Sequence, residues 1–284
     1  MMRLAPHLGL TSIYDGLFIH HAGVDPLRQI AFIAERGFAG VEDNFLQLRP
    51  AEMQVRIGEA LARNGLVMGC FLATLTLDRP TFSLDAVDIV EMLKSELQRA
   101  IETAKRVGGR SLTLILGRST SGVPRDLQLR RAVENLKQCA ELAERADVVL
   151  LVEPISRARW ADILVSRVDD AVTLCREVNS PAVRLLFDVY QCQRESGNLL
   201  DTLDRAWNDV GAIQIADCPG RCEPGTGEIN FENVLRHIRT KSWDGLIELE
   251  HAASIPGRVG EIAVLDVCAR LSEATSRARS EIVC

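Results

Sequence analysis

The sequence predicts an α/β fold, a closed (β/α)8 or TIM barrel, and three observations support this prediction. Short apolar runs alternate with longer amphipathic segments eight times along the 284 residues. The runs suit parallel strands that are buried on both faces. Eight strand and helix units in a chain of this length are typical of one barrel, and no linker or low-complexity tract divides the chain. We therefore expect a single domain over residues 1–284.

The apolar runs are the eight predicted strands. They occupy residues 7–13, 37–45, 66–74, 111–118, 148–155, 183–191, 211–218 and 246–252. Between them, segments such as residues 25–37, 51–65, 93–109 and 129–147 carry apolar residues at spacings of three and four, as helices with one buried face do. Several of these segments end in Gly, which relieves the left-handed helix C-terminus. The main rival is an open doubly wound sheet, which would usually show a Gly-rich turn after its first strand, and LTSIYDGL is no such turn.

Composition and charge exclude several classes of partner. A net charge of -6 and a pI near 5.5 provide no basic surface for nucleic acid. The apolar runs are too short to cross a membrane, and the N-terminus lacks the features of a secretory signal. Eight scattered cysteines suit a reducing compartment. We expect a cytoplasmic protein with a small-molecule substrate and no nucleic-acid or membrane partner, and the sequence leaves association into a homo-oligomer open.

Polar side chains interrupt four consecutive apolar runs near their ends, where the active sites of this fold collect. They are Glu153, Asp188, Gln214 and Glu250. Burying them costs free energy unless something compensates, and a cation would do so. Three carboxylates and one amide oxygen favour Mn2+ or Mg2+, with Co2+ or Zn2+ as alternatives. Taken one at a time, each residue could instead cap a strand end or join an ion-pair network.

Motifs at these strand ends resemble a known family. The stretches LVEPI, FDVYQCQ, IQIADCPGRCEPGTGEINF and LIELEH, with APHLG and GFAGVEDNF near the N-terminus, resemble the hydroxypyruvate isomerase branch of the xylose isomerase-like TIM barrels. Ketose 3-epimerases, dehydratases and endonuclease IV belong to the same group. The resemblance covers nearly the whole chain, and the stretch from Arg221 to Asn230 is its most specific part.

The resemblance implies roles for individual residues. Glu153, Asp188, Gln214 and Glu250 would bind one divalent metal, and Glu153 and Glu250 would also transfer protons. Arg221 and Glu223 match substrate-side positions of the family. Gln191 stands where this branch commonly has a histidine, so it can hydrogen-bond substrate but cannot carry a proton at neutral pH.

Further residues near the strand ends are candidates for substrate contact. Arg118 and Arg221 could bind a substrate carboxylate, and Glu42 could bind a substrate hydroxyl. Trp160 could form part of the pocket wall. The alternatives are solvated loop charge for the two arginines, a helix cap or loop position for Glu42, and packing under a loop for Trp160. Glu248 lies one layer deeper than Glu250 and needs a partner that the sequence does not identify. A zinc site of Cys70, Cys192, Cys218 and Cys222 lacks paired CxxC spacing, so we expect free thiols.

These observations together predict a metal-dependent aldose-ketose isomerase. It would interconvert a small 2-keto acid of the hydroxypyruvate type and an aldehyde sugar acid through a cis-enediolate, using two glutamates. A ketose 3-epimerase and a dehydratase are alternatives within the fold, and a non-catalytic binding barrel is the alternative outside enzymes. Endonuclease IV would need a histidine cluster and a basic surface, which the sequence lacks.

Overall fold

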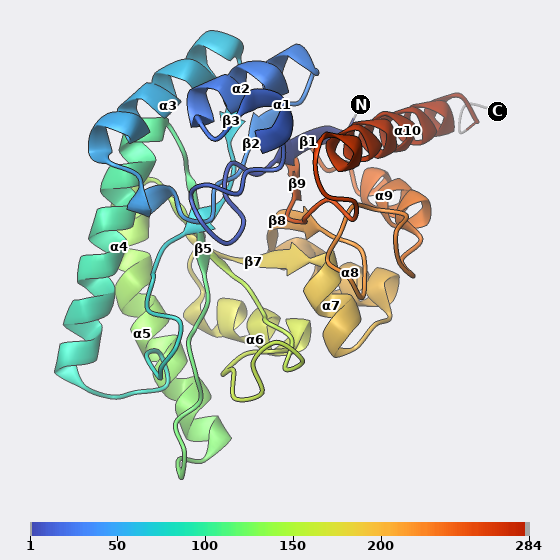
Figure 1. Ribbon diagram of the computed structural model, residues 1–284. Helices are drawn as coiled ribbons and strands as arrows, with labels where there is room; N and C mark the ends of the chain where they lie inside the picture. Colours follow the sequence, from blue (N-terminus) through green and yellow to red (C-terminus); the bar gives the residue numbers. More distant parts are fainter. Residues whose placement is uncertain (1, 282–284) are drawn as a thin grey trace.

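Nine β-strands surround the centre of the computed structural model, which describes residues 2–281 (Figure 1). They are β1 (Arg3–Pro6), β2 (Gly40–Val41), β3 (Val67–Met68), β4 (Phe71–Leu72), β5 (Ser111–Leu114), β6 (Val149–Val152), β7 (Val183–Asp188), β8 (Val210–Ile215) and β9 (Leu246–Leu249). Seven of them form a sheet in the order β1, β9, β8, β7, β6, β5, β4, and β2 pairs with β3. Every pair is parallel, as the doubly buried apolar runs predicted.

Backbone hydrogen bonds close these strands into the predicted barrel. On one side of β2, the N–H of Ala39 donates to the carbonyl of Leu4 at 2.9 Å and the N–H of Glu42 donates to that of Pro6 at 3.1 Å. On its other side, β2 pairs with β3, and the N–H of Leu72 donates to the carbonyl of Asn44 at 3.2 Å. Because β3 and β4 are two halves of one predicted strand, the barrel has eight strand positions.

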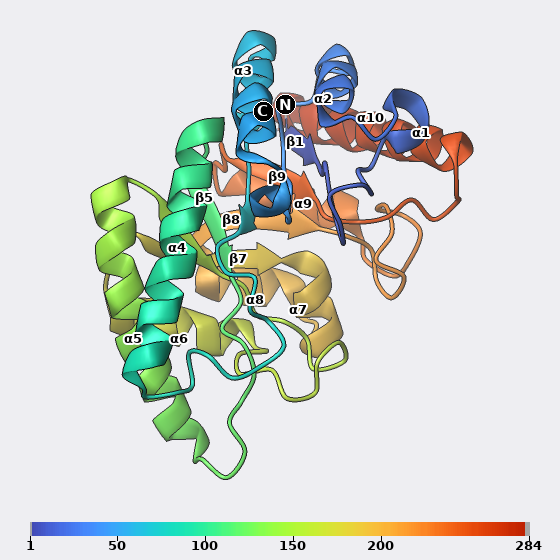
Figure 2. The same ribbon diagram turned by 60° about the vertical axis from the view of Figure 1, so that its left-hand side comes forward.

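The helices form a layer outside the strands in both views (Figures 1 and 2). They are α1 (Ile19–Ala22), α2 (Pro26–Glu35), α3 (Ala51–Asn64), α4 (Val87–Val107), α5 (Arg125–Ala146), α6 (Val168–Val178), α7 (Val189–Glu195), α8 (Leu199–Ala206), α9 (Phe231–Thr240) and α10 (Arg258–Glu281), with 3-10 turns at Leu46–Leu48 and Trp207–Asp209. Gly65 and Gly108 end α3 and α4 with φ of 66° and 68°, a conformation that glycine adopts without strain. The last helix contacts the first, because Glu261 of α10 accepts the N–H of His20 in α1 at 2.6 Å.

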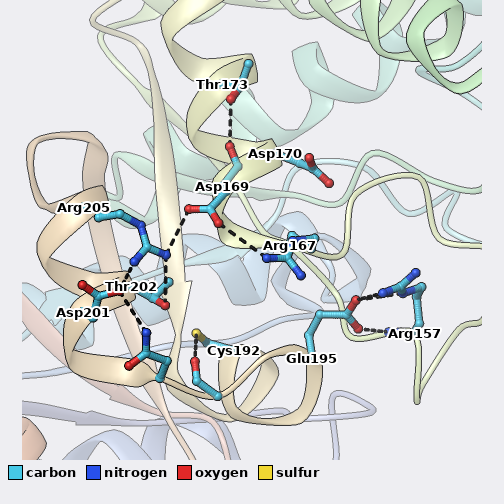
Figure 3. Close-up of polar contacts among 12 residues, drawn as sticks. Arg157, Arg167, Asp169, Asp170, Thr173, Cys192, Glu195, Asp201, Thr202 and Arg205 are labelled. Atoms are coloured by element: carbon cyan, nitrogen blue, oxygen red, sulfur yellow. Dashed lines mark hydrogen bonds and ion pairs between the residues drawn. The ribbon is translucent and has the colours of Figure 1, made fainter.

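Polar contacts also tie neighbouring helices together on the outside of the barrel. Arg205 of α8 reaches Asp169 of α6 at 3.4 Å, and Arg157 pairs with Glu195 of α7 (Figure 3). The pair of Arg205 and Asp169 is exposed on both sides, and such pairs contribute little individually to stability. Among the helices of residues 2–281, none combines the length and the apolar character that crossing a bilayer requires.

Most of the predicted strand boundaries differ from the observed ones, and local hydrogen bonds explain two of the differences. The first strand spans Arg3–Pro6 rather than residues 7–13, because Asp15 accepts the N–H groups of Leu10 at 2.8 Å and Ser12 at 3.2 Å and so folds this stretch into a turn. The strand predicted over residues 183–191 ends at Asp188, whose Oδ1 caps α7 by accepting the N–H of Tyr190 at 2.8 Å.

Candidate functional site

Three buried carboxylates converge at the carboxyl ends of the strands. Glu153 directly follows β6, Asp188 ends β7 and Glu250 directly follows β9; their exposed fractions are 4%, 3% and 5%. One oxygen from each lies within 4.8 Å of the other two. Parallel strands bring their ends to one face of the barrel, and this arrangement places three residues far apart in the sequence around one point.

Two buried oxygen atoms at this point have no hydrogen-bond partner among the described residues. One is Oδ2 of Asp188, whose Oδ1 is already occupied at the start of α7. The other is Oε1 of Gln214, a residue that lies beside Asp188 in the strand register of β7 and β8. Because buried polar atoms are normally paired, such oxygen atoms are available to a cation. The donor set fits a hard divalent ion such as Mg2+ or Mn2+.

Burial and mutual repulsion perturb the acid-base properties of these carboxyls. Burial raises the pKa of Glu153 well above its usual range, and the charges of Glu250 and Asp188 raise it further, while Arg221 and Arg159 lower it. Burial also raises the pKa of Asp188 to about 7, with the charge of Glu250 as the second cause. A divalent cation among them would offset this repulsion and favour the ionised forms.

The carboxylate of Glu250 has a partner on each oxygen. Arg221 donates to Oε2 at 2.5 Å, and the side-chain amide of Asn44 donates to Oε1 at 2.8 Å. The Arg221 guanidinium also lies 3.9 Å from Oδ2 of Asp188. Sequence reasoning missed Asn44, although it lies near the end of the predicted strand GFAGVEDNF, where a polar residue reaches the same face of the barrel.

Arg221 is held by a loop that is built around a buried carboxylate. The loop covers residues 218–229, and Asp217, two residues after the end of β8, accepts N–H groups from four of its residues. Its Oδ1 accepts from Cys218 and Ile229 at 2.8 and 3.1 Å, and its Oδ2 from Gly225 and Gly227 at 2.8 and 2.9 Å. A Cβ on Gly227 would overlap the carbonyl of Cys218, so a side chain there would disturb this fold. Sequence reasoning had not identified Asp217.

A cavity of about 220 Å3 opens onto the carboxylates. Its polar lining includes Glu153, Glu250, Gln191, Arg221 and Arg159, together with Thr11 and Asn44. Its apolar lining consists of Leu10, Phe45, Leu72, Leu77, Ile115, Ile155 and Trp160. Gln191 lies in the first turn of α7 rather than on a strand, and its Oε1 accepts the N–H of Ser156 at 3.0 Å. The size and lining suit a small polar molecule.

Three candidates for substrate contact lie outside this lining. Arg118 pairs with Asp162 at 2.6 Å, and its guanidinium carbon lies 4.4 Å from the centre of the Trp160 ring. Glu223 accepts both the backbone N–H and the hydroxyl of Ser254, at 2.7 and 2.6 Å. Glu42 is fully buried below the carboxylates. Their expected contacts with substrate therefore have no support in this arrangement.

A second polar layer lies beneath the site. Oε2 of Glu42 accepts the side-chain N–H of Gln214 at 3.1 Å, and Oε1 of Glu248 accepts the backbone N–H of Cys70 at 2.8 Å. Burial raises the pKa of Glu248 to about 7 and that of Glu42 well above its usual range. The partner of Glu248 that the sequence did not identify is thus a backbone N–H.

Cysteines do not contribute to the candidate metal site. Burial raises the pKa of the Cys70 thiol well above its ordinary value. Cys192, Cys218 and Cys222 are also free thiols with raised pKa, each chiefly through burial. Among the described residues, the group of acidic, histidine and cysteine side chains that could hold a metal ion consists of carboxylates alone. The expectation of free thiols is confirmed for these four residues.

Comparisons with known proteins agree with the fold and include two named isomerases. A family model described as "Xylose isomerase-like TIM barrel" matches residues 30–266. The chain is 28% identical over 256 residues to the 2-oxo-tetronate isomerase of Cupriavidus necator, covering 88% of this chain and 93% of that protein. It is 29% identical over 161 residues to the hydroxypyruvate isomerase of Escherichia coli, covering 57% of this chain and 62%, less than two thirds, of that relative. A solved structure of L-ribulose 3-epimerase superposes with a TM-score of 0.79 at 19% identity, covering 99% of this chain and 97% of that one.

Proposed function

Because the chain belongs to the xylose isomerase-like TIM barrel family, we propose that it is a metal-dependent isomerase that interconverts a small 2-keto acid and an aldehyde sugar acid. The names of the two similar isomerases support the reaction class and the acid substrate. The observation that carries the proposal is the set of three carboxylates within 4.8 Å of one another at a small, partly apolar cavity.

The metal would be held by Glu153, Asp188, Gln214 and Glu250. Two of these residues offer buried oxygen atoms that have no hydrogen-bond partner in the described structure, Oδ2 of Asp188 and Oε1 of Gln214. A bound Mn2+ or Mg2+ would disperse the negative charge that develops on the substrate oxygens and so acidify the adjacent C–H bond. Co2+ and Zn2+ remain alternative ions for the same ligands.

Glu153 and Glu250 would move the proton between the two substrate carbons. They follow β6 and β9, which lie three strand positions apart, and both line the cavity. One carboxylate takes the proton from the hydroxyl-bearing carbon to give a cis-enediolate, and it or its partner returns a proton to the former carbonyl carbon. A second proton passes from the original hydroxyl oxygen to the original carbonyl oxygen, so the reaction balances without a redox partner.

Neighbouring groups set the environment of this proton transfer. Arg221 and Asn44 occupy the two oxygens of Glu250 and hold its carboxylate in one orientation. Apolar side chains such as Leu72, Ile115 and Ile155 line part of the cavity. They limit the access of water, which would otherwise protonate an enediolate without control of position.

A turnover assay tests this proposal. Metal-reconstituted protein is incubated with hydroxypyruvate or 2-oxo-tetronate, and NMR records the aldehyde product. We expect turnover that a chelator abolishes, and we expect Glu153→Gln and Glu250→Gln each to lower kcat by about 100-fold or more, because each removes a proton-transfer group. Glu59→Gln, on the exposed surface of α3, is the matched control and should keep wild-type turnover. Wild-type turnover in both site variants, or conversion of neutral ketoses alone, would contradict the proposal.

A further inference from the structure

Arg159 brings an uncompensated positive charge to the cavity. It lies in the segment that follows β6, it lines the cavity, and its guanidinium carbon lies 5.3 Å from the centre of the Trp160 ring. In the part of the chain whose side chains the structure describes, no carboxylate lies within ion-pair distance of it. Its charge nevertheless acts on Glu153, whose pKa it lowers. A cation near the reacting groups is therefore available to an anionic ligand.

The other two arginines near the site are already neutralised. Arg221 contacts Glu250 at 2.5 Å and Asp188 at 3.9 Å, so a substrate carboxylate there would compete with two protein carboxylates. Arg118 pairs with Asp162 at 2.6 Å and does not line the cavity. Arg159 therefore differs from both candidates that the sequence suggested for carboxylate binding, because they have carboxylate partners and it has none among the described residues.

We propose that Arg159 binds the carboxylate of the substrate and so selects 2-keto acids over neutral ketones. This inference rests on the proposed function, which places the reacting carbons at Glu153 and Glu250. A guanidinium donates two parallel hydrogen bonds to a carboxylate, and Trp160 provides an apolar surface that limits its orientations. Arg159 and the two glutamates line the same cavity of about 220 Å3, a volume that accommodates an acid of three or four carbons.

Arg157 provides a matched control two residues earlier in the chain. Its guanidinium pairs with Glu195 of α7, with Nε donating to Oε1 at 2.7 Å (Figure 3). It is exposed, as Arg159 is, and it does not line the cavity. Arg157→Gln therefore removes the same charge from the same segment without removing a group from the cavity.

The test compares Arg159→Gln, Arg159→Lys and Arg157→Gln in the metal-reconstituted full chain. For Arg159→Gln we expect KM for hydroxypyruvate or 2-oxo-tetronate to rise about 10- to 100-fold, the usual effect of losing a charged hydrogen-bonded pair. The affinity for Mn2+ should stay within about twofold, and Arg159→Lys should restore part of the KM. Arg157→Gln should behave as wild type. Circular dichroism verifies that each variant is folded.

A binding measurement makes the result independent of turnover. Calorimetry should show weaker binding of pyruvate to Arg159→Gln than to wild type. Hydroxyacetone, which lacks a carboxylate, should bind both proteins with equal affinity. Unchanged KM and unchanged pyruvate binding in Arg159→Gln would overturn the role of Arg159 while wild-type turnover continued. Absence of turnover in the wild type on every acid would instead contradict the proposed function, and pyruvate binding would still decide the role of Arg159.

Discussion

At the scale of single residues, Gln214 can bind a cation only if its side-chain amide presents the oxygen rather than the nitrogen. Glu42 supplies the reason for that orientation, because its Oε2 accepts the Nε2–H of Gln214 at 3.1 Å and leaves Oε1 without a partner in the described structure. Glu42 was a candidate for substrate contact in the sequence. Its position beneath the cavity makes it a positioning residue in our account.

Substitution of Glu42 tests this orientation. We expect Glu42→Leu to weaken Mn2+ binding about 10- to 100-fold, as loss of a group that orients a ligand commonly does. Glu42→Gln keeps an acceptor oxygen and should retain most of the affinity. Electron paramagnetic resonance of free Mn2+ measures both, and urea unfolding separates affinity from stability. Equal Mn2+ affinity in wild type and a folded Glu42→Leu protein would contradict this role.

Sequence reasoning predicted the carboxylates of the site but not all of its cations. Glu153, Asp188 and Glu250 interrupt apolar strands, so burial and periodicity place them at the strand ends. Arg118 and Arg159 follow strands in irregular segments, and the direction of a loop side chain has no such periodicity. Only the structure shows that Asp162, 44 residues from Arg118, neutralises it and leaves Arg159 facing the cavity.

At the scale of elements, the loop of residues 218–229 depends on one carboxylate. The Gly-rich motif in this loop suggested a tight turn, and that interpretation agrees with the N–H groups of Gly225 and Gly227 that point at Asp217. Sequence reasoning missed Asp217 because the four donors become neighbours only after the loop has folded. The strand prediction over residues 7–13 failed for a similar reason, since Asp15 gathers the N–H groups of that stretch.

Replacement of Asp217 should loosen this loop. Asp217→Asn turns one acceptor oxygen into a donor that faces backbone N–H groups, and we expect it to lower the free energy of unfolding by about 1–3 kcal/mol. Because Arg221 would lose its support, kcat should also fall. Urea unfolding and the isomerase assay measure the two effects. Asp201→Asn, which affects an exposed ion pair with Arg205 (Figure 3), should cost less than about 1 kcal/mol; similar losses in both variants would contradict the role of Asp217.

At the scale of the whole molecule, the count of alternating segments predicted the barrel, and the structure confirms it. The parallel register then determines the site, because it aligns Asp188 with Gln214 and brings the ends of β6 to β9 together. The interruption between β3 and β4 could not be predicted. It occurs at Gly69, where a Cβ would overlap the carboxylate of Glu248, and that contact joins residues that lie far apart in the sequence.

The central claim is that two glutamates exchange a proton with a carbon of a small keto acid. Solvent deuterium uptake tests it most directly. Metal-reconstituted protein in deuterated water should label the hydroxymethyl carbon of hydroxypyruvate, as recorded by NMR, and the double variant of Glu153→Gln and Glu250→Gln should abolish this labelling while remaining folded. Labelling that continues unchanged in the double variant, or that is absent from the wild type with metal bound, would contradict the account.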